Sequence, residues 1–296
     1  MNNFKKWLVA LDNTEMDDHL FRFINSADKP IDYKELHFIH IASSVGLTDK
    51  VGTQNRLEEG IEKIKNELQA KIENNLPGKV FSLTLLQGNP GKHLISISKE
   101  INPDLLVLGR KAVSGAEGVK PEELVAVANC STLLLPGYLN YSFNSILAAV
   151  DFSEISIAAL KAAIKISDKA DAQLQVQHVC TIPSDFRRTG KSYEEYAEKL
   201  KIMADKEATE FLNHFNLKPG ILYTYADKNE TADSIAAFAK NNKADLLIMG
   251  SKGRTNAAAV FMGSIAEKTA KLLNDIPLMV VKEKNANLNL LQAIVG

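Results

Sequence analysis

The sequence has little cysteine and no excess of charge of either sign. Its two cysteines, Cys130 and Cys180, lie 50 positions apart in a chain of 296 residues. They therefore supply neither a disulfide framework nor a zinc site. The 35 basic and 36 acidic side chains give a formal net charge of −1. This balance argues against a protein that binds the phosphate backbone of nucleic acids, which usually carries a basic excess.

Long apolar runs are also missing. None approaches the ~20 residues that a membrane-spanning helix needs. The apolar run nearest the N-terminus, Trp7–Leu11, is shorter than the about 7 residues of the shortest signal-peptide core. We therefore expect a cytoplasmic protein with no membrane and no nucleic-acid partner. The length predicts two domains, because a domain usually contains roughly 150 residues.

The chain repeats itself, which indicates two homologous halves. Three segments recur in the same order: Leu8–Glu15 as Leu147–Glu154 (offset 139), His40-Ile41 as His178-Val179 (offset 138), and Pro103–Gly109 as Ala244–Gly250 (offset 141). Three ordered matches at nearly one offset are not expected by chance. We therefore predict one domain over residues 1–138, a second over residues 139–284, and an apolar C-terminal tail over residues 285–296.

Each half alternates segments typical of strands with segments typical of helices. The expected strands cover about 7–11, 36–41, 80–86, 105–108 and 132–135 in the first half, and 146–150, 174–179, 221–225, 246–249 and 278–281 in the second. This alternation predicts an α/β fold, with a doubly wound parallel sheet of five strands in each domain. In such sheets ligands bind beyond the carboxyl ends of the strands. Asp12, Asp151, Gly109 and Gly250 directly follow expected strands, so they should lie at that edge.

A glycine-rich segment follows the fourth strand of the second half. Gly250 is followed after two residues by Gly253, and after nine more by Gly263-Ser264, which precedes an expected helix. Glycines allow the main chain to approach an anion and to adopt positive φ. The free N–H groups and the dipole of a helix start favour an anion, and the Ser264 hydroxyl could add a donor or cap the helix. The pattern predicts a phosphate site.

This pattern resembles the universal stress protein family in its tandem two-domain form. Its ATP-binding members contain Gly-x2-Gly-x9-Gly-(Ser/Thr) after the fourth strand, an Asp after the first strand and a His-Val end to the second. The matching residues here are Gly250, Gly253, Gly263, Ser264, Asp151 and His178-Val179. The resemblance covers residues 4–283 and implies the adenine nucleotide alpha hydrolase-like fold.

The resemblance also implies a role for each matching residue. Asp151 would accept hydrogen bonds from the nucleoside, and the main chain of Val179 would hold the adenine. Gly250 would lie near the ribose. The residues expected near the phosphates are Gly253, Gly263, Ser264 and Ile265. The implied ligand is ATP, although ADP and AMP share most of these contacts, and Mg²⁺ could accompany it. The alternative is a glycine-rich loop that serves structure alone.

The first half departs from this pattern. Ala112 stands where the second glycine would be, and Glu122 and Glu123 stand where Gly-Ser would be. Carboxylates at that position would repel a triphosphate. We therefore expect the first half not to bind ATP in the family's manner and to act as a structural partner, with a smaller anion left open at Arg110 and Lys111.

Two functions follow, and a third is weaker. The first is a stress-response regulatory protein that binds an adenine nucleotide in its second domain. The second is a dimerising interaction module that needs no nucleotide. An ATP-consuming enzyme is less favoured, because no carboxylate is evidently placed for Mg²⁺ or water and no arginine finger can be named. Slow hydrolysis is the most we expect, and we assign no catalytic and no metal-binding residue.

The resemblance further implies pairing of the two domains through their fifth strands, 132–135 with 278–281. A homodimer of the chain is an additional expectation. His40 lies in the half predicted not to bind nucleotide, and His178 occupies the matching position in the half predicted to bind it. That repetition indicates packing or hydrogen bonding rather than catalysis. Cys180 has no evident partner and is expected to be a small thiol at the edge of the core.

Overall fold

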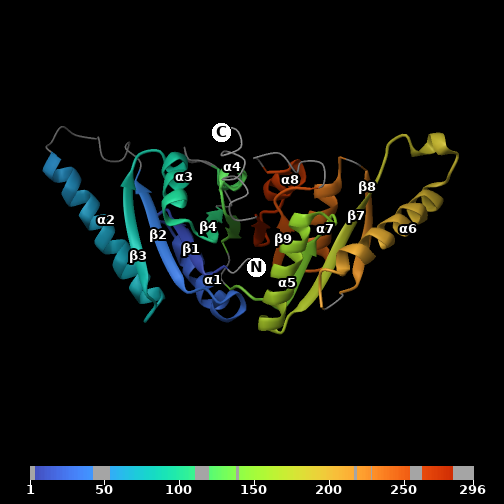
Figure 1. The fold of residues 1–296 in the computed structure, drawn as a ribbon. Coiled ribbons are helices and arrows are strands. Elements are labelled where there is room, and N and C mark those ends of the chain that lie inside the picture. The colour runs from blue at the N-terminus through green and yellow to red at the C-terminus, as the bar shows by residue number, and fades with distance from the viewer. Residues whose placement is uncertain are drawn as a thin grey trace, which may run out of the picture. The chain divides into compact units, whose positions relative to one another are not determined.

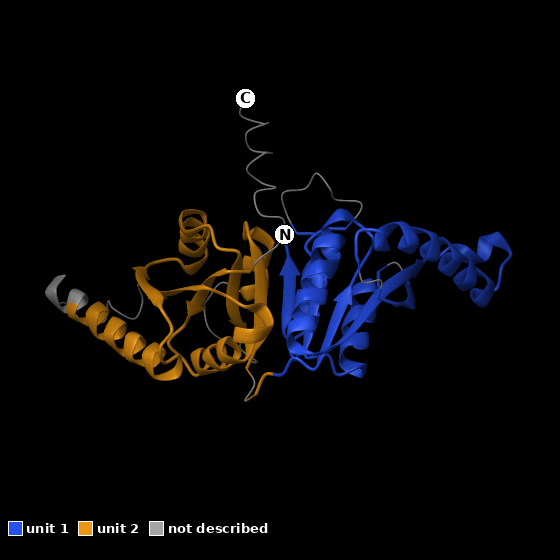
Figure 2. Ribbon diagram, turned by 60° about the horizontal axis from the view of Figure 1, so that its bottom comes forward, with its two compact units in different colours: residues 1–2, 142–283 blue, residues 3–141, 284–296 orange. Residues whose placement is uncertain are grey.

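The computed structural model describes residues 4–42, 54–110, 120–137, 140–216, 219–227, 229–253 and 262–282, with side chains of the second helix described from residue 59. The described chain forms two compact units (Figures 1 and 2). We call the described residues up to Tyr141 the first half and those from Ser142 to Lys282 the second half. Within these ranges, no helix is long and apolar enough to span a membrane.

The first half is a parallel five-stranded sheet with helices between its strands. Its elements are β1 (Lys6–Leu11), α1 (Met16–Ile31), β2 (Glu35–Ala42), α2 (Gln54–Asn75), β3 (Phe81–Gln87), α3 (Pro90–Ile101), β4 (Leu105–Arg110), α4 (Pro121–Val127) and β5 (Ser131–Pro136). The strand order is β3-β2-β1-β4-β5, and every pair is parallel.

The second half repeats this architecture. Its elements are β6 (Ser145–Ala149), α5 (Glu154–Ala170), β7 (Gln173–Ile182), the 3₁₀ turn η2 (Phe186–Thr189), α6 (Tyr193–Leu212), β8 (Ile221–Asp227), α7 (Thr231–Asn241), β9 (Leu246–Gly250), α8 (Ser264–Leu272) and β10 (Leu278–Val281). Within it the order is β8-β7-β6-β9-β10, again parallel. The predicted fold class is confirmed.

The central strands are apolar because helices cover both faces of a parallel sheet. Trp7 to Val9 in β1 and Ile146 to Ala148 in β6 are fully buried. Right-handed crossovers place α5 and α6 on one face of the second sheet, and α7 and α8 on the other. The strand order reverses at β6, since the chain moves from it first to β7 and later back to β9. A ligand site is therefore expected beyond the end of β6.

The repeat extends to individual hydrogen bonds. Asp104 accepts the main-chain N–H groups of Lys5 and Lys6 at 2.9 and 3.0 Å. Asp245 does the same at the start of β6, at 2.7 and 3.0 Å. Left-handed residues also recur in pairs at the repeat offsets: Asn13 and Phe152, Asp32 and Asp171, Asn102 and Lys243. These features belong to the scaffold, because they are the same in both halves.

Candidate functional site

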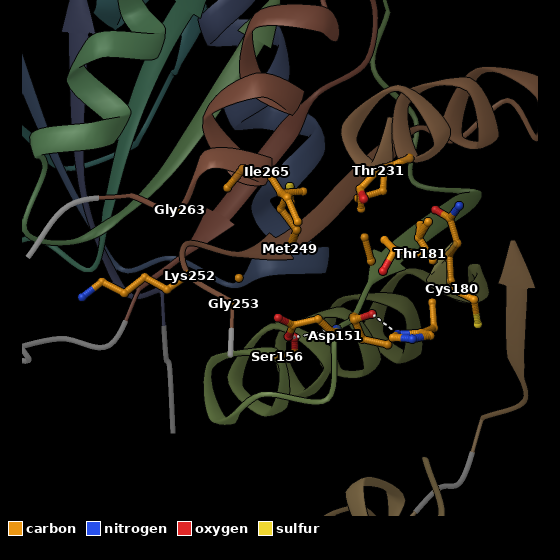
Figure 3. Close-up of a pocket in the computed structure, with 18 of the residues that line it drawn as sticks. Asp151, Ser156, Cys180, Thr181, Thr231, Met249, Lys252, Gly253, Gly263 and Ile265 are labelled. Carbon is orange, nitrogen blue, oxygen red and sulfur yellow. Dashed lines mark hydrogen bonds between the residues drawn. The ribbon is translucent and has the colours of Figure 1, made fainter. Parts of the chain in front are cut away.

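A cavity of about 390 Å³ lies at the carboxyl ends of the strands in the second half (Figure 3). Its wall is made by the ends of β6, β7 and β9, the starts of α5, α7 and α8, and one side of α6. All the site residues predicted from the sequence line it: Asp151, Val179, Gly250, Gly253, Gly263, Ser264 and Ile265. Residues up to 114 positions apart, from Asp151 to Ile265, are thus brought to one cavity.

Asp151 is held rigidly by the first turn of α5. Its Oδ1 accepts the N–H of Ser153 at 3.1 Å, the Ser153 hydroxyl at 2.5 Å and the Ser156 hydroxyl at 2.7 Å. Its own N–H donates to Ser156 Oγ at 3.1 Å. These bonds fix the carboxylate so that Oδ2 faces Gly253. Such a carboxylate is suited to accept hydrogen bonds from a ligand hydroxyl.

Val179 presents its main chain at a step between two strands. β6 ends at Ala149, whereas β7 continues to Ile182. The N–H of Val150 donates to the C=O of Gln177 at 2.9 Å. Since alternate residues of a strand direct their main-chain groups to the same neighbour, the N–H and C=O of Val179 point beyond the end of β6. A planar base with one donor and one acceptor can bind there.

Gly250 and Gly253 provide space, and none of the three glycines has an unusual backbone conformation. Positive φ among the described glycines occurs elsewhere, at Gly78, Gly88 and Gly190, so that part of the expectation is wrong. A Cβ on Gly253 would lie 2.7 Å from Asp151 Oδ2, and one on Gly250 would lie 2.9 Å from Ile155 Cγ2. Side chains at these positions would displace the carboxylate or the start of α5.

Helix α8 begins at the cavity. Gly263 is its N-cap, and no side chain within the described residues caps it. The expected cap by Ser264 is therefore wrong, because Ser264 is already the first helical residue. The N–H of Gly263 donates to Ser251 C=O at 2.8 Å, and Ser251 N–H donates to Val281 C=O at 2.9 Å. This chain of bonds fixes the helix start, whose N–H groups and dipole favour an anion.

His178 forms a structural hydrogen bond, as predicted. Its Nδ1 lies 2.9 Å from the C=O of Val150, and its ring stacks on Phe152 with centroids 4.2 Å apart. His40 makes the matching bond to the C=O of Leu11 at 3.0 Å. In both halves the bond ties the second strand to the end of the first.

Cys180 lines the cavity but is not an activated nucleophile. Burial first, and then the nearby carboxylates of Asp205 and Glu207, raise the pKa of its thiol to about 11. A thiol with this pKa is almost entirely protonated at neutral pH, whereas a reactive cysteine needs a lowered pKa. The expectation of a thiol at the edge of the core fits this environment.

The first half has a buried acid where the second has a hydroxyl. Asp17 matches Ser156 and likewise accepts the N–H of the preceding aspartate, Asp12, at 3.0 Å. Burial raises its pKa to about 6, and the neighbouring charge of Asp12 acts in the same direction. Lys71 Nζ lies 3.7 Å from Asp17 Oδ2 and opposes the shift. In the first half, the carboxyl groups of Asp12 and Asp17 therefore lie side by side where the second half has Asp151 beside the hydroxyl of Ser156.

The end of β4 also differs from the end of β9. Gly109 is followed by Arg110, whose side chain is buried, whereas Gly250 is followed by the small Ser251. Burial lowers the pKa of Arg110, and the charge of Glu122 partly restores it. Glu122 and Glu123 occupy the first turn of α4, a helix of seven residues. Acidic side chains thus stand at the helix start of the first half, as predicted; Ala112 and Lys111 lie outside the described residues.

A model of the universal stress protein family matches residues 3–136 and again residues 142–282. The chain belongs to the universal stress protein family. The two matches support the tandem form, and the family assigns the chain to stress-response proteins. A universal stress protein of Methanocaldococcus jannaschii is 28% identical over 142 residues, covering 48% of this chain and 83% of the relative. One of Bacillus subtilis is 26% identical over 148 residues, covering 47% of this chain and 99% of the relative.

The fold is shared by a solved structure of a universal stress protein from Archaeoglobus fulgidus. That structure is similar to this chain with a TM-score of 0.65 and 19% identity, covering 96% of this chain and 98% of the other. At this identity the likeness concerns the fold alone. The family membership and the tandem arrangement predicted from the repeats are confirmed.

Several cavity residues of this universal stress protein were not predicted from its sequence. They are Gln177 on β7, Thr231 at the start of α7, and Leu200, Met203 and Glu207 on α6. Gln177 carried little signal, because its strand also contains Gln173, Gln175 and His178, and only the fold shows that Gln177 is completely buried. The residues of α6 carried none, since their spacing is that of an ordinary helix face.

Proposed function

We propose that the cavity of the second half binds an adenine nucleotide, with ATP as the foremost candidate and ADP or AMP sharing most contacts. One observation carries the proposal: a fixed carboxylate, an open main-chain donor and acceptor, and a glycine-lined helix start all surround one cavity of about 390 Å³. Nucleotides need these three kinds of partner, for the ribose hydroxyls, the base and the phosphates.

In the proposed complex, the base lies against the main chain of Val179. The ribose lies between Asp151 and Gly250, and Asp151 accepts its hydroxyls. The phosphates lie at Gly253, Gly263, Ser264 and Ile265. Lys252 lines the cavity beside the glycines, and its side chain points away from Gly253 and Asp151 (Figure 3). Mg²⁺ would accompany the phosphates as a counterion.

We propose a regulatory role for this binding rather than a metabolic activity. Within the described lining, the side chains most suited to act as nucleophile or base are constrained. The pKa of Cys180 is raised to about 11, and His178 is tied to the main chain of Val150. Activated nucleophiles and bases need the opposite environment. Slow hydrolysis is therefore the most that we propose, and bound nucleotide would act by stabilising one conformation.

Calorimetric titration of the full chain with ATP and Mg²⁺ tests this proposal. The variant Gly263→Glu places a carboxylate at the start of α8, as Glu122 does at α4. Its Cβ would lie 3.4 Å from Lys252 Cα, an ordinary contact, so the variant should fold. The matched control is Gly220→Glu, because a Cβ there meets nothing within 4 Å and Gly220 is not among the residues that line the cavity.

We expect one site per chain in the wild type and in Gly220→Glu, and a loss of at least tenfold in affinity in Gly263→Glu. Two sites in the wild type would mean that the first half also binds. No binding in the wild type would exclude the nucleotide function and favour the alternative, an interaction module that needs no nucleotide.

We also propose that the two domains pair within the chain and that the protein is cytoplasmic. β5 and β10 are the outer strands of their own half, next to β4 and β9 respectively. Both are apolar, and exposed apolar edge strands favour pairing. A homodimer is a further proposal, which light scattering tests: a monomer at micromolar concentration would exclude the homodimer and leave pairing within the chain. Cell fractionation tests the location.

A further inference from the structure

Two buried polar atoms in the cavity wall have no hydrogen-bond partner among the described residues. They are Oε1 of Gln177 on β7 and Oγ1 of Thr231 at the start of α7. Gln177 is 0% exposed and Thr231 is 8% exposed. A buried polar atom without a partner destabilises a fold, so such atoms usually meet a ligand or an ordered water.

The amide of Gln177 is fixed by a short network on the α7 face of the sheet. Its Nε2 donates to Thr224 Oγ1 at 2.9 Å, and Thr224 Oγ1 lies 3.3 Å from Ser234 Oγ. The network uses the donor end of the amide. What remains at the cavity wall is the carbonyl oxygen, which can only accept a hydrogen bond.

Thr231 adds a hydroxyl and a helix start to the same wall. It is the first residue of α7, and its N-cap Glu230 makes no side-chain capping bond. In Figure 3, Thr231 and Thr181 lie at one end of the cavity, and Lys252 and Gly263 lie at the other. The unpartnered hydroxyl of Thr231 thus belongs to the end of the cavity away from the glycine-lined helix start, and Gln177 lies on β7 two residues before Val179.

The scaffold does not require polar residues at these positions. The residue of the first half that matches Gln177 at the offset of 138 is Ile39, which is 1% exposed. The residue that matches Thr231 at the offset of 141 is Pro90, the first residue of α3. The first half, which has acidic groups at the start of α4, therefore lacks both polar atoms. The second half, which contains the cavity, has both.

We propose that Gln177 and Thr231 read the amino edge of the bound base and select a 6-aminopurine over a 6-oxopurine. This rests on the proposed function and specifies its ligand. Val179, two residues after Gln177 on the same side of β7, accepts one hydrogen of the exocyclic amine through its C=O. The Gln177 carbonyl accepts the other, and Thr231 Oγ1 shares that second hydrogen, because the amine has only two. A carbonyl at C6 would face the carbonyl oxygens of Val179 and Gln177 without a hydrogen to share, and only the Thr231 hydroxyl could donate to it.

The test compares ATP with inosine triphosphate, which differs at C6 by a carbonyl in place of the amine. Both are titrated into the full chain as wild type, Gln177→Leu, Thr231→Val and the matched control Gln175→Leu. Gln175 lies on the same strand and face and also has a buried Oε1 without a partner, but it is absent from the cavity lining. Thermal unfolding confirms that each variant folds.

We expect the wild type to prefer ATP, and Gln177→Leu to reduce the ATP-to-inosine-triphosphate affinity ratio about 10- to 100-fold, as side-chain contacts to a base edge usually do. Thr231→Val, which keeps the side-chain shape, should reduce the ratio several-fold. Gln175→Leu should leave it unchanged.

Equal losses for both nucleotides in Gln177→Leu, or an unchanged ratio, would overturn this inference while nucleotide binding stood. If Gln177→Leu fails to fold, an unchanged ratio in Thr231→Val overturns it. A wild type that binds neither nucleotide overturns the proposed function, and this inference with it.

Discussion

The carboxyl edges of the two sheets differ while the scaffolds beneath them are the same. In both halves an aspartate before the fourth strand, Asp104 or Asp245, accepts main-chain N–H groups at the start of the first strand. In both, a histidine of the second strand, His40 or His178, bonds to the main chain at the end of the first. At the edge, the second half has small or neutral residues where the first has ionisable ones: Ser156 against Asp17, Ser251 against Arg110, and Gly263 against the acidic first turn of α4.

This comparison separates the residues that build the fold from those that build the site. Bonds common to both halves are needed whether or not a ligand is present. Residues that differ at the edge decide whether an anion can approach the helix start. The first half forms the same five-stranded sheet with acids at the positions of Ser156 and Gly263, so the sheet itself does not depend on these small residues.

The largest expected effect concerns Asp17. Its folded pKa of about 6 lies above the ordinary 3.8, so the folded state binds the proton more tightly than the unfolded state. The contribution of Asp17 to stability is therefore present below about pH 4 and is lost as the pH rises to about 6. Asp17→Ser removes this loss and should stabilise the first half at pH 7.5 by on the order of 3 kcal/mol, since one pKa unit is about 1.4 kcal/mol.

Urea unfolding of wild type and Asp17→Ser at pH 7.5 and at pH 4 measures this gain. The two proteins should converge at the lower pH. The reverse exchange, Ser156→Asp, should destabilise the second half at pH 7.5. A gain from Asp17→Ser that is the same at both pH values would show that ionisation of Asp17 is not its cause.

The second prediction compares alanine variants of the two aspartates that follow the first strands. Asp151→Ala should weaken ATP binding about 30-fold, because a hydrogen bond to a charged group contributes roughly 1.5–3 kcal/mol. Asp12→Ala, its counterpart, should leave the affinity unchanged. Calorimetry on both variants measures the difference, and equal losses would mean that the first half takes part in binding.

The third prediction tests the space at Gly253. A Cβ there would lie 2.7 Å from Asp151 Oδ2, so Gly253→Ala must displace the carboxylate. We expect about a tenfold loss of ATP affinity, which corresponds to about 1.4 kcal/mol. Gly220→Ala is the control, since a Cβ there meets nothing within 4 Å. Unchanged affinity in Gly253→Ala would show that Asp151 is not held against the glycine in the bound state.

The smallest effect should be equal in the two halves. His40→Phe and His178→Phe each remove one hydrogen bond to the end of the first strand, at 3.0 and 2.9 Å. Each should cost about 1 kcal/mol of stability, seen as a small fall in the temperature of unfolding. An intact melting temperature with lost ATP hydrolysis in His178→Phe would instead assign that histidine to catalysis.

The strands were predictable from the sequence to within a few residues, but the length of β7 was not. The sequence predicts its end near residue 179, whereas the strand continues to Ile182. The extension exists because β7 pairs with β8 up to Asp227 after β6 has ended. That overhang creates the step at which Val179 presents its main chain, so a tertiary pairing decided a central feature of the site.

The residues of the cavity likewise divide into those that the sequence predicts and those that only the fold identifies. The spacing of Gly250, Gly253 and Gly263 could be read from the chain, because each glycine is tied to a strand end or a helix start. Gln177 and Thr231 could not be assigned, because polar residues in a strand and at a helix start have many ordinary uses. They became candidates only once the fold buried them in the cavity wall without partners.

The sequence by itself determined that two homologous α/β domains follow one another and that their fourth-strand loops differ in charge. Repeat offsets and apolar periodicity are properties of the sequence itself, so they can be recognised without a structure. The tertiary structure alone decided that Gly250 and Gly253 are needed for space rather than for positive φ, that Asp17 is buried beside Asp12, and that β7 overhangs β6. Those facts depend on contacts between residues that are distant in the sequence, because burial and close approach arise only from such contacts.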